Sequence, residues 1–336
     1  MTEAVLVVGG AGYIGAHVCK ALAAAGQLPV VLDNLSTGHR DFVRWGPLVE
    51  ASVTATDIVR ATLAAHQITT AIDLAACIEV GESVRDPLKF YANNVAAKVA
   101  FLVALRDGGV ERIILSSTAA VYGEPAATPI PETHPLRPAN PYGRSKLAYE
   151  QMLGDLAAAG GPRFLALRYF NAAGADADGV IGEMHEPETH LIARAALAVL
   201  GAVPALEIFG ADWPTPDGTP IRDYIHVSDI AAAHVAAIVA MQHGATITAC
   251  NLGTGEGASV AQVLACFAAA GAPVPHHFGP RRGGDPARLV ADPSLAKQVL
   301  GWVPLHSALD NIVRSALAWH RANGALLANP GRLARG

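Results

Sequence analysis

The sequence has few cysteines, and they stand far apart. Cys19, Cys77, Cys250 and Cys266 have neither the spacing of a metal motif nor the density of a small disulfide-stabilised domain. We interpret them as reduced thiols of the protein core. A cytoplasmic protein is the expectation that follows.

Charge is also scarce, since only 16% of the 336 residues are charged and the net charge is −5. No stripe of lysine and arginine runs along the chain, which argues against a nucleic-acid partner. No uncharged apolar stretch reaches the roughly eighteen residues that a membrane span needs. The first apolar run, residues 4–8, follows Glu3 and is too short for a signal peptide. We therefore expect neither a membrane nor a nucleic acid as partner.

The sequence does contain a regular alternation of strand-like and helix-like segments. Strands are predicted for the apolar runs 4–8, 29–33, 70–74, 111–116 and 163–169, and helices for 13–25, 57–66, 88–107 and from 141 onward. This series predicts an α/β protein with a Rossmann-type, doubly wound parallel sheet. Beyond Asn171 the chain is more irregular, and a smaller mixed α/β lobe is expected there. Its predicted helices are 188–200, 228–242, 259–270 and 305–323.

A glycine-rich stretch, GGAGYIG, lies between the first predicted strand and the first predicted helix. Gly9, Gly12 and Gly15 would let the backbone turn sharply and approach a pyrophosphate at the helix N-terminus. Asp33 closes the next strand, where a carboxylate binds the ribose hydroxyls of NAD and repels the 2′-phosphate of NADP. A glycine turn alone is a weak signal, but this context predicts NAD binding.

A second stretch, NPYGRSKLAYE at residues 140–150, has the features of a helix start. Asn140 suits the N-cap and Pro141 the first helical position. Tyr142 and Lys146 are four residues apart and share a helix face, so the ammonium would lower the pKa of the phenol. The alternative is a tyrosine packed by its ring beside a solvated lysine.

A third stretch, LSSTAAVYG at residues 115–123, follows a predicted strand. Ligands bind outside the carboxyl ends of parallel strands, so Thr118 can donate a hydrogen bond to a substrate hydroxyl that faces Tyr142. A run of small hydroxyl residues can equally be an ordinary turn.

Together these stretches resemble the extended short-chain dehydrogenase/reductase family, and within it the 4-epimerases of UDP-hexoses. The resemblance extends from residue 4 to about residue 320. It rests on eight motifs in the same order: GGAGYIG (9–15), DNL (33–35), VGES (80–83), NNV (93–95), SST (116–118), YGRSK (142–146), RYFN (168–171) and RDYIHV (222–227).

The resemblance implies NAD-dependent epimerisation at C4 of UDP-glucose and UDP-galactose. The sugar would be oxidised transiently to a 4-keto sugar, and hydride would return to the opposite face. Three catalytic residues are implied. Tyr142 would take the proton of the 4-hydroxyl, Lys146 would hold the nicotinamide ribose and lower the pKa of Tyr142, and Thr118 would position the hydroxyl.

The same resemblance implies two sets of binding residues. NAD would be bound by Gly9, Gly12, Tyr13, Ile14, Gly15, Asp33, Asn34, Asp57, Asn94, Tyr142, Lys146 and Tyr169. The UDP-sugar would be bound by Thr118, Tyr142, Asn171, His190, Arg222, Tyr224, Arg282, Asp285 and Leu289.

The implied organisation has two parts. An NAD-binding Rossmann domain would comprise residues 1–172, joined by roughly 224–256. A UDP-sugar-binding lobe would comprise 173–223 and 257–330, followed by a frayed tail at 331–336. A homodimer is expected through the helices at 88–107 and 141–159.

Three positions depart from the family pattern. Thr118 stands where serine is frequent, and its hydroxyl can do the same job. Ile78 stands where some members carry a lysine that reaches the cofactor phosphates, which could weaken the retention of NAD. Leu289 replaces a tyrosine beside the sugar C2 substituent, so an N-acetyl group could be admitted.

No metal site is predicted. The four candidate histidines, His185, His190, His276 and His277, have no ordinary ligand spacing, and the implied reaction needs no metal.

Two alternatives remain open. Another sugar-nucleotide enzyme on the same framework would epimerise UDP-N-acetylhexosamines or UDP-pentoses, or decarboxylate a uronate. Dehydration is disfavoured, because Ala119 and Ala120 stand where a dehydratase needs an acid pair. A redox sensor or scaffold that only holds NAD belongs to a different class and would lack a catalytic side chain. Thr118, Tyr142 and Lys146 are all present.

Overall fold

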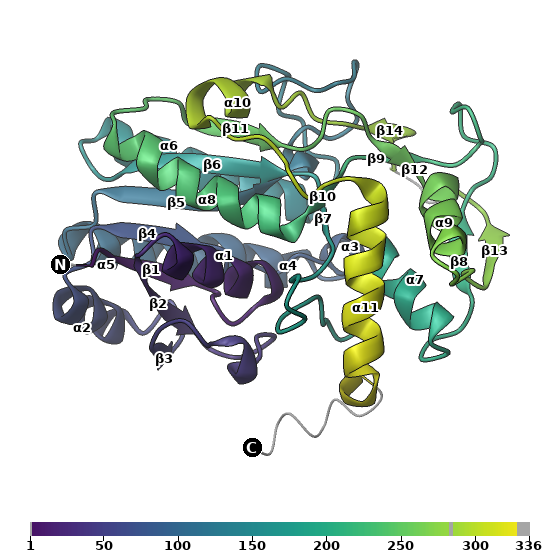
Figure 1. The fold of residues 1–336 in the computed structure, drawn as a ribbon. Helices are drawn as coiled ribbons and strands as arrows, with labels where there is room; N and C mark the ends of the chain where they lie inside the picture. The colour runs from purple at the N-terminus through teal and green to yellow at the C-terminus, as the bar shows by residue number, and fades with distance from the viewer. Residues whose placement is uncertain (1, 282–284, 328–336) are drawn as a thin grey trace.

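The centre of the molecule is a seven-stranded sheet, shown in Figure 1. The computed structural model describes residues 2–281 and 285–327. The strand order is β11-β6-β5-β4-β1-β2-β3, and every neighbouring pair is parallel. The strands are β1 Ala4–Val8, β2 Leu28–Asp33, β3 Leu48–Glu50, β4 Thr70–Asp73, β5 Arg112–Thr118, β6 Arg163–Tyr169 and β11 Ala249–Leu252. The predicted fold class is confirmed.

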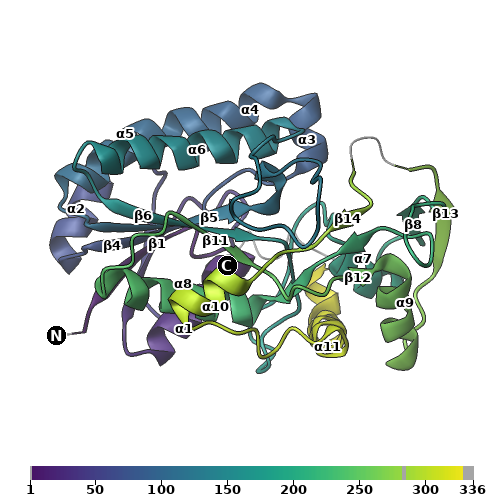
Figure 2. The same cartoon turned by 90° about the horizontal axis from the view of Figure 1, so that it is seen from above.

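Helices cover both faces of this sheet, as Figure 2 shows. One face carries α1 (Tyr13–Ala24), α8 (Val227–Gln242) and α10 (Ser294–Leu300). The other carries α2 (Thr56–His66), α5 (Ala97–Asp107) and α6 (Pro141–Ala158).

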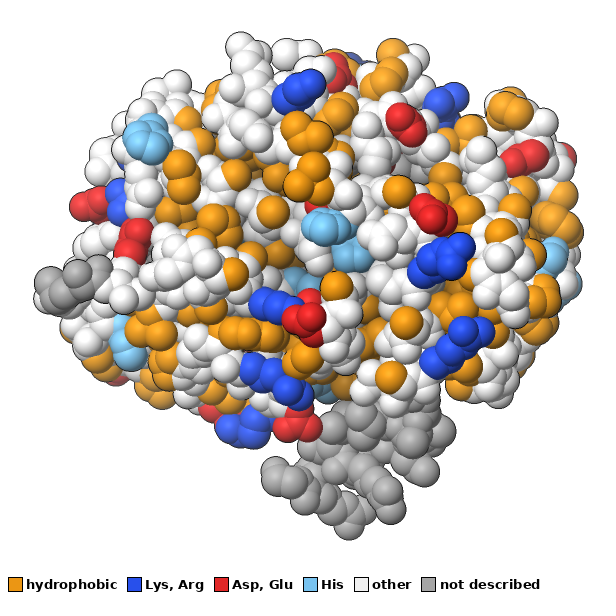
Figure 3. Space-filling view, viewed as in Figure 1, with side chains coloured by type: hydrophobic (Ala, Val, Ile, Leu, Met, Phe, Trp, Pro, Cys, Tyr) orange, Lys and Arg blue, Asp and Glu red, His pale blue; other side chains and the backbone are white. Residues whose placement is uncertain are grey.

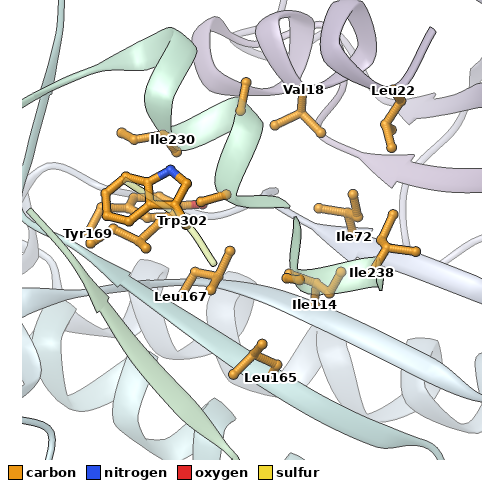
Figure 4. Close-up of a cluster of buried hydrophobic side chains, with 14 of the residues drawn as sticks. Val18, Leu22, Ile72, Ile114, Leu165, Leu167, Tyr169, Ile230, Ile238 and Trp302 are labelled. Carbon is orange, nitrogen blue, oxygen red and sulfur yellow. The ribbon is translucent and has the colours of Figure 1, made fainter. Parts of the chain in front are cut away.

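Strand β1 is buried on both of its faces. Val5 and Val7 pack into the first core, and Leu6 and Val8 pack into the second. A strand with two covered faces reads as an unbroken apolar run, which is why AVLVV shows no polar alternation. Figure 4 shows the first core, in which Trp302 lies at one end near Tyr169 and Ile230.

The remaining elements form a smaller group of helices and short strands beside the sheet (Figure 1). Helices α7 (Leu191–Val199), α9 (Val260–Ala269) and α11 (Leu309–Leu327) belong to it, and the three share a third apolar core. Its short strands are β7 Asn171–Ala173 with β10 Tyr224–His226, β8 Leu206–Phe209 with β13 His276–Gly279, and β9 Ile221–Arg222 between β12 Ala258–Ser259 and β14 Arg288–Leu289.

The predicted helix 88–107 is a composite of α4 (Pro87–Tyr91), a π-helical turn η2 (Ala92–Ala96) and α5, and it follows the short helix α3 (Val80–Arg85). Among the described residues, Pro87–Asp107 is the one helical stretch long and apolar enough to cross a membrane. Of its most apolar window, 39% is buried in the fold. Two single-turn helices, η1 (Arg40–Phe42) and η3 (Ala119–Val121), complete the described elements.

Two helices begin later than predicted, α7 at Leu191 and α11 at Leu309. For α7 the cause is a carboxylate that holds the preceding turn. Oε1 of Glu188 accepts the backbone N–H groups of Thr189 and His190, each at 2.8 Å. These amides bind a side chain instead of joining a helix, so the helix starts one residue after them.

Candidate active site

The order of the strands reverses beside β1, which pairs with β2 on one side and with β4 on the other. In an open parallel sheet, ligands bind at such a switch point, outside the carboxyl ends of the strands. Gly9 lies there with a φ of 78°, a conformation that favours glycine. A Cβ on Gly9 would come within 2.9 Å of the backbone nitrogen of Ala75, so the chain segments after β1 and β4 are in close contact.

The first turn of α1 is pressed against this glycine loop. A Cβ on Gly15 would overlap the carbonyl oxygen of Gly9 and lie 2.7 Å from the Cα of Gly10. Gly12, the N-cap residue, provides no side-chain hydrogen bond, so the N–H groups of the first turn remain available to an anion. The three predicted glycines therefore fit a pyrophosphate such as that of NAD.

Asp33 ends β2 beside the same loop, and only 8% of the residue is exposed. Its carboxylate accepts backbone N–H groups from Ala11 at 3.0 Å and from Leu35 at 2.8 Å. Burial raises the pKa of Asp33, and the two N–H groups lower it. A carboxylate fixed in this way fits the ribose hydroxyls of NAD and would disfavour a further phosphate there.

Helix α6 begins as the sequence predicts. Oδ1 of Asn140 accepts the N–H of Gly143 at 2.8 Å, which caps the helix and sets half-buried Tyr142 in its first turn. Thr118 ends β5, and its side chain lies close enough to the Tyr142 phenol to lower the pKa of that phenol. Because Oγ1 of Thr118 also accepts the N–H of Ala120 at 3.1 Å, its own proton is free to point toward the phenol oxygen. The structure therefore brings Thr118 and Tyr142 together.

The pKa of Tyr142 is raised to about 12, the opposite of the predicted direction. Burial is the largest cause of the rise, the neighbouring hydroxyl of Thr118 lowers the pKa, and the charge of Glu79 raises it. Lys146 is not among the groups that shift it. Burial lowers the pKa of Lys146 itself to about 8, although nearby Asp73 raises it. The two shifts do not support the predicted lowering of the Tyr142 pKa by Lys146, because burial disfavours the charged form of each group.

A fully buried ion pair acts electrostatically on Lys146. Both carboxylate oxygens of Asp73, at the end of β4, accept hydrogen bonds from Nζ of Lys98 at 2.8 Å. The hydroxyl of Tyr149, on α6, donates to the same carboxylate at 2.7 Å. This network joins β4, α5 and α6. The sequence analysis did not identify Asp73 or Lys98 as part of the site. The only feature of the sequence that could have indicated this pair is an acidic residue at the end of an apolar strand.

Asn94 lies in the π-helical turn and is buried. Its side chain accepts the N–H of Cys77 at 2.8 Å and donates to the carbonyl of Cys77 and to Oγ of Ser145, each at 3.0 Å. Ser145 precedes Lys146 and donates to the carbonyl of Tyr142 at 2.8 Å. Asn94 therefore ties the loop after β4 to the turn that carries the two predicted catalytic residues.

Two predicted cofactor residues have their phenol groups engaged elsewhere. The hydroxyl of Tyr13 donates to the carbonyl of Gly174 at 2.6 Å. The hydroxyl of Tyr169 lies 3.2 Å from Nε2 of His234, and its ring belongs to the core in Figure 4. Contacts of either residue with a cofactor would therefore involve the backbone or the ring.

Three other predicted cofactor residues are only partly buried or exposed. Ile14 is half-buried in α1, and Asn34 is exposed after β2. Asp57 lies in the first turn of α2 with a fully exposed side chain, 3.3 Å from the guanidinium of Arg60. These side chains are available to a ligand.

Three predicted substrate residues surround one small cavity. Asn171, His190 and Tyr224 line it together with Glu183, and its volume of about 20 Å³ is room for one water molecule. Strands β7 and β10 place Asn171 opposite Tyr224. The cavity is far too small for a sugar, so these residues would mark the wall of a substrate site rather than its interior.

Arg222 and Leu289 face each other in strands β9 and β14. The guanidinium of Arg222 donates to two backbone carbonyls at 2.9 Å and lies 3.9 Å from the carboxylate of Asp285. Arg282 was also predicted here, but it lies outside the described residues. The structure thus brings three of these four predicted substrate residues together.

Asp223 is a residue whose importance the sequence analysis missed. It is fully buried, and one carboxylate oxygen accepts the N–H and the hydroxyl of Thr254 at 2.8 and 2.6 Å. The other accepts the N–H groups of Gly255 and Ala291 at 3.0 and 3.1 Å. Three chain segments are therefore fixed next to Arg222.

Comparison with known proteins agrees with this geometry. Residues 5–253 match the model of the NAD dependent epimerase/dehydratase family. A UDP-glucose 4-epimerase of Rhizobium leguminosarum bv. trifolii is 49% identical over 319 residues, which is 95% of this chain and 97% of that protein.

Solved structures resemble the whole fold. The crystal structure of UDP-glucose 4-epimerase from Brucella ovis in complex with NAD is 48% identical, with a TM-score of 0.92, and the match covers 94% of this chain and 98% of that one. The UDP-glucose 4-epimerase from Bifidobacterium longum in complex with NAD+ and UDP is 35% identical, with a TM-score of 0.90, and the match covers 96% of this chain and 99% of that one.

Proposed function

Because this chain belongs to the NAD dependent epimerase/dehydratase family, we propose that it interconverts UDP-glucose and UDP-galactose by epimerisation at C4. The observation that carries the proposal is the closeness of Thr118, at the end of β5, to Tyr142, in the first turn of α6, at the carboxyl edge of the sheet. The glycine loop and Asp33 at the same edge fit NAD, which when bound supplies the hydride acceptor and donor for the sugar carbon. The alternative sugar-nucleotide reactions are not favoured by these relatives.

Tyr142 would take up the proton of the sugar 4-hydroxyl. Thr118 would fix the position of that hydroxyl, because its own hydroxyl lies beside the same phenol oxygen. The raised pKa keeps Tyr142 protonated near neutral pH in this structure. A protonated tyrosine is the proton donor that the reverse half of an epimerisation requires, and it becomes a base when positive charge is bound beside it.

The binding lobe would hold the nucleotide while the sugar turns. Arg222 offers planar donors that suit a diphosphate, and Asp285 offers a carboxylate for ribose hydroxyls. We assign this role to residues 173–223 and 257–327, and cofactor binding to 1–172 with 224–256. Such a division needs the nucleotide held firmly and the hexose held loosely.

The test is turnover of UDP-galactose by the purified protein, with and without added NAD. Tyr142→Phe should reduce the rate by about 10²- to 10⁴-fold while the content of bound NAD stays unchanged. Tyr91→Phe, which removes a hydroxyl from partly exposed α4, is the matched control and should keep full activity. Full activity of Tyr142→Phe, or no interconversion by the wild type with NAD, would contradict the proposal.

We also propose a cytoplasmic homodimer. The four cysteines of the chain are all free, as expected of a reducing compartment. The face of the molecule in Figure 3 shows scattered lysines and arginines without a basic stripe. Apolar side chains on α3, α4 and α5 are unusually exposed: Val80, Val84, Leu88, Val99 and Val103. A second copy would cover this row, because exposed apolar rows favour association.

Light scattering after gel filtration tests the dimer. Leu88→Glu, at a side chain that is 76% exposed, should yield monomers. Leu305→Glu alters an equally exposed leucine outside these helices and should leave the dimer intact. A monomeric wild type would refute this part.

A further inference from the structure

Four potential metal ligands converge in the segment between β7 and α7. Glu183, His185, Glu188 and His190 each offer one donor atom, and the four atoms lie within 4.8 Å of one another. In the sequence they form the pattern E-x-H-x-x-E-x-H. The sequence analysis considered only the histidines, so it did not detect the pattern. His276 and His277 belong to β13 instead.

The separations between these donors match a tetrahedral site. Oε1 of Glu183 lies 2.8 Å from Nδ1 of His190 and 3.6 Å from Nδ1 of His185. Oε2 of Glu188 lies 3.3 Å from Nδ1 of His185, at hydrogen-bond distance, and Oε1 of the same carboxylate lies 3.4 Å from Nδ1 of His190. Ligands about 2.0–2.1 Å from a tetrahedral zinc ion lie about 3.3 Å apart, so the observed separations bracket that value.

The hydrogen bonding leaves one side of the cluster unsatisfied. Glu183 is 3% exposed, and its Oε1 has no hydrogen-bond partner, nor has Nδ1 of His190. The two atoms are close, but their geometry is not that of a hydrogen bond. A buried carboxylate without a donor is costly, and a cation between the donors would remove that cost.

Charge balance points the same way. Two buried carboxylates need two positive charges, which either two imidazolium protons or one divalent cation can supply.

We propose that Glu183, His185, Glu188 and His190 bind a divalent transition-metal ion of the zinc class. Two imidazoles and two carboxylates suit such an ion, whereas magnesium and calcium prefer oxygen ligands alone. His190 would then act as a metal ligand rather than through direct contact with the sugar.

The ion would be structural, because residues 183–190 contact several elements on the side of the molecule where NAD is predicted to bind. His185 packs edge-on against Tyr13 of α1, with ring centroids 6.3 Å apart. The hydroxyl of Thr189 donates to the carboxylate of Glu79 in the loop after β4. The backbone carbonyl of Met184 is 3.0 Å from Nε2 of His39, in the loop after β2. A metal that fixes 183–190 would therefore fix its contacts with Tyr13, a predicted NAD-binding residue, and with the loops after β2 and β4.

The experiment is metal binding by the full-length protein after chelator treatment, without nucleotide. Zinc content measured by mass spectrometry after gel filtration should reach about one ion per chain, and cobalt should give the strong visible absorption of a tetrahedral site. Glu183→Gln should weaken binding at least about tenfold. His276→Ala, which removes a histidine of β13, is the control and should bind as the wild type does.

Three results would overturn the proposal: less than stoichiometric zinc in the wild type, unchanged affinity in Glu183→Gln, or lost binding in His276→Ala.

Discussion

Replacing Gly15 with alanine tests the tight packing on which the predicted NAD site depends. The new Cβ would overlap the carbonyl oxygen of Gly9 and lie 2.7 Å from the Cα of Gly10. Ordinary contacts between carbon atoms are about 3.5–4.0 Å, so α1 would have to move by about 1 Å. Both obstructing atoms belong to the backbone, so no side chain can rotate away.

The free-energy cost of this steric overlap can be separated from the effect of helix propensity by a matched substitution. Gly154→Ala, on α6, would place its Cβ 4.0 Å from the ring of Phe164, an ordinary contact. Both substitutions gain about 1 kcal/mol of helix propensity. Overpacking of a rigid core typically costs about 1–3 kcal/mol, so Gly15→Ala should be destabilised relative to Gly154→Ala by at least that amount.

The assay is chemical denaturation with equilibrium free energies, alongside the content of bound NAD. Gly154→Ala should be slightly more stable than the wild type and keep its cofactor. Gly15→Ala should be less stable than Gly154→Ala and bind NAD at least about tenfold more weakly, because the moved helix loses hydrogen bonds to a charged group. If the two variants were equally stable and equally loaded with NAD, the packing argument would fail.

Three further predictions concern single interactions. Thr118→Ala should move the acidic limb of the pH–rate profile upward, because Thr118 helps to lower the pKa of Tyr142 to its value of about 12 and Tyr142 must be deprotonated to act as the base, and Thr118→Ser should restore the profile. Asp73→Asn should cost about 3–5 kcal/mol in urea unfolding, since it leaves buried Lys98 unpaired, whereas Glu111→Gln at an exposed ion pair should change little. Ser259→Ala removes the capping box of α9 and should lower the melting temperature by the equivalent of about 1 kcal/mol; an unchanged midpoint would contradict that cap.

The sequence was sufficient wherever structure is decided by neighbouring residues. The strands of the large sheet can be recognised in the sequence as apolar runs, because both of their faces are buried. The N-cap of α6 involves residues three apart, and the glycine loop is one short motif. Strands of two or three residues, such as β9, were not predictable, because they exist only through pairing with β12 and β14, distant in sequence.

Helix α11 shows the same limit at a helix end. It begins at Leu309 rather than near 305, because the carboxylate of Asp229 accepts the N–H groups of Leu305 and His306 and the hydroxyl of Ser307. Asp229 is more than seventy residues away in sequence. Local propensity favours an earlier start, and a tertiary contact overrides it.

The residues of the candidate site also fall into those that short motifs predict and those that only the fold brings together. Tyr142, Thr118 and the glycines belong to short motifs and were predicted. Asp73 and Lys98 are 25 residues apart, and the partners of Asp223 are 31 to 68 residues away, so only the fold brings them together.

The direction of the Tyr142 pKa explains why a lysine four residues away is not enough. The pKa values of Tyr142 and Lys146, about 12 and about 8, differ by about four units, so moving the phenol proton to the amine would cost about 5 kcal/mol. Burial produces this gap by penalising both charged forms, and sequence spacing carries no information about burial. Positive charge bound beside the phenol would close the gap, because a low-dielectric site strengthens such an interaction. The ability of Tyr142 to act as a base would therefore depend on positive charge held at the predicted NAD site, and removal of the proton would then require the hydride acceptor to be bound.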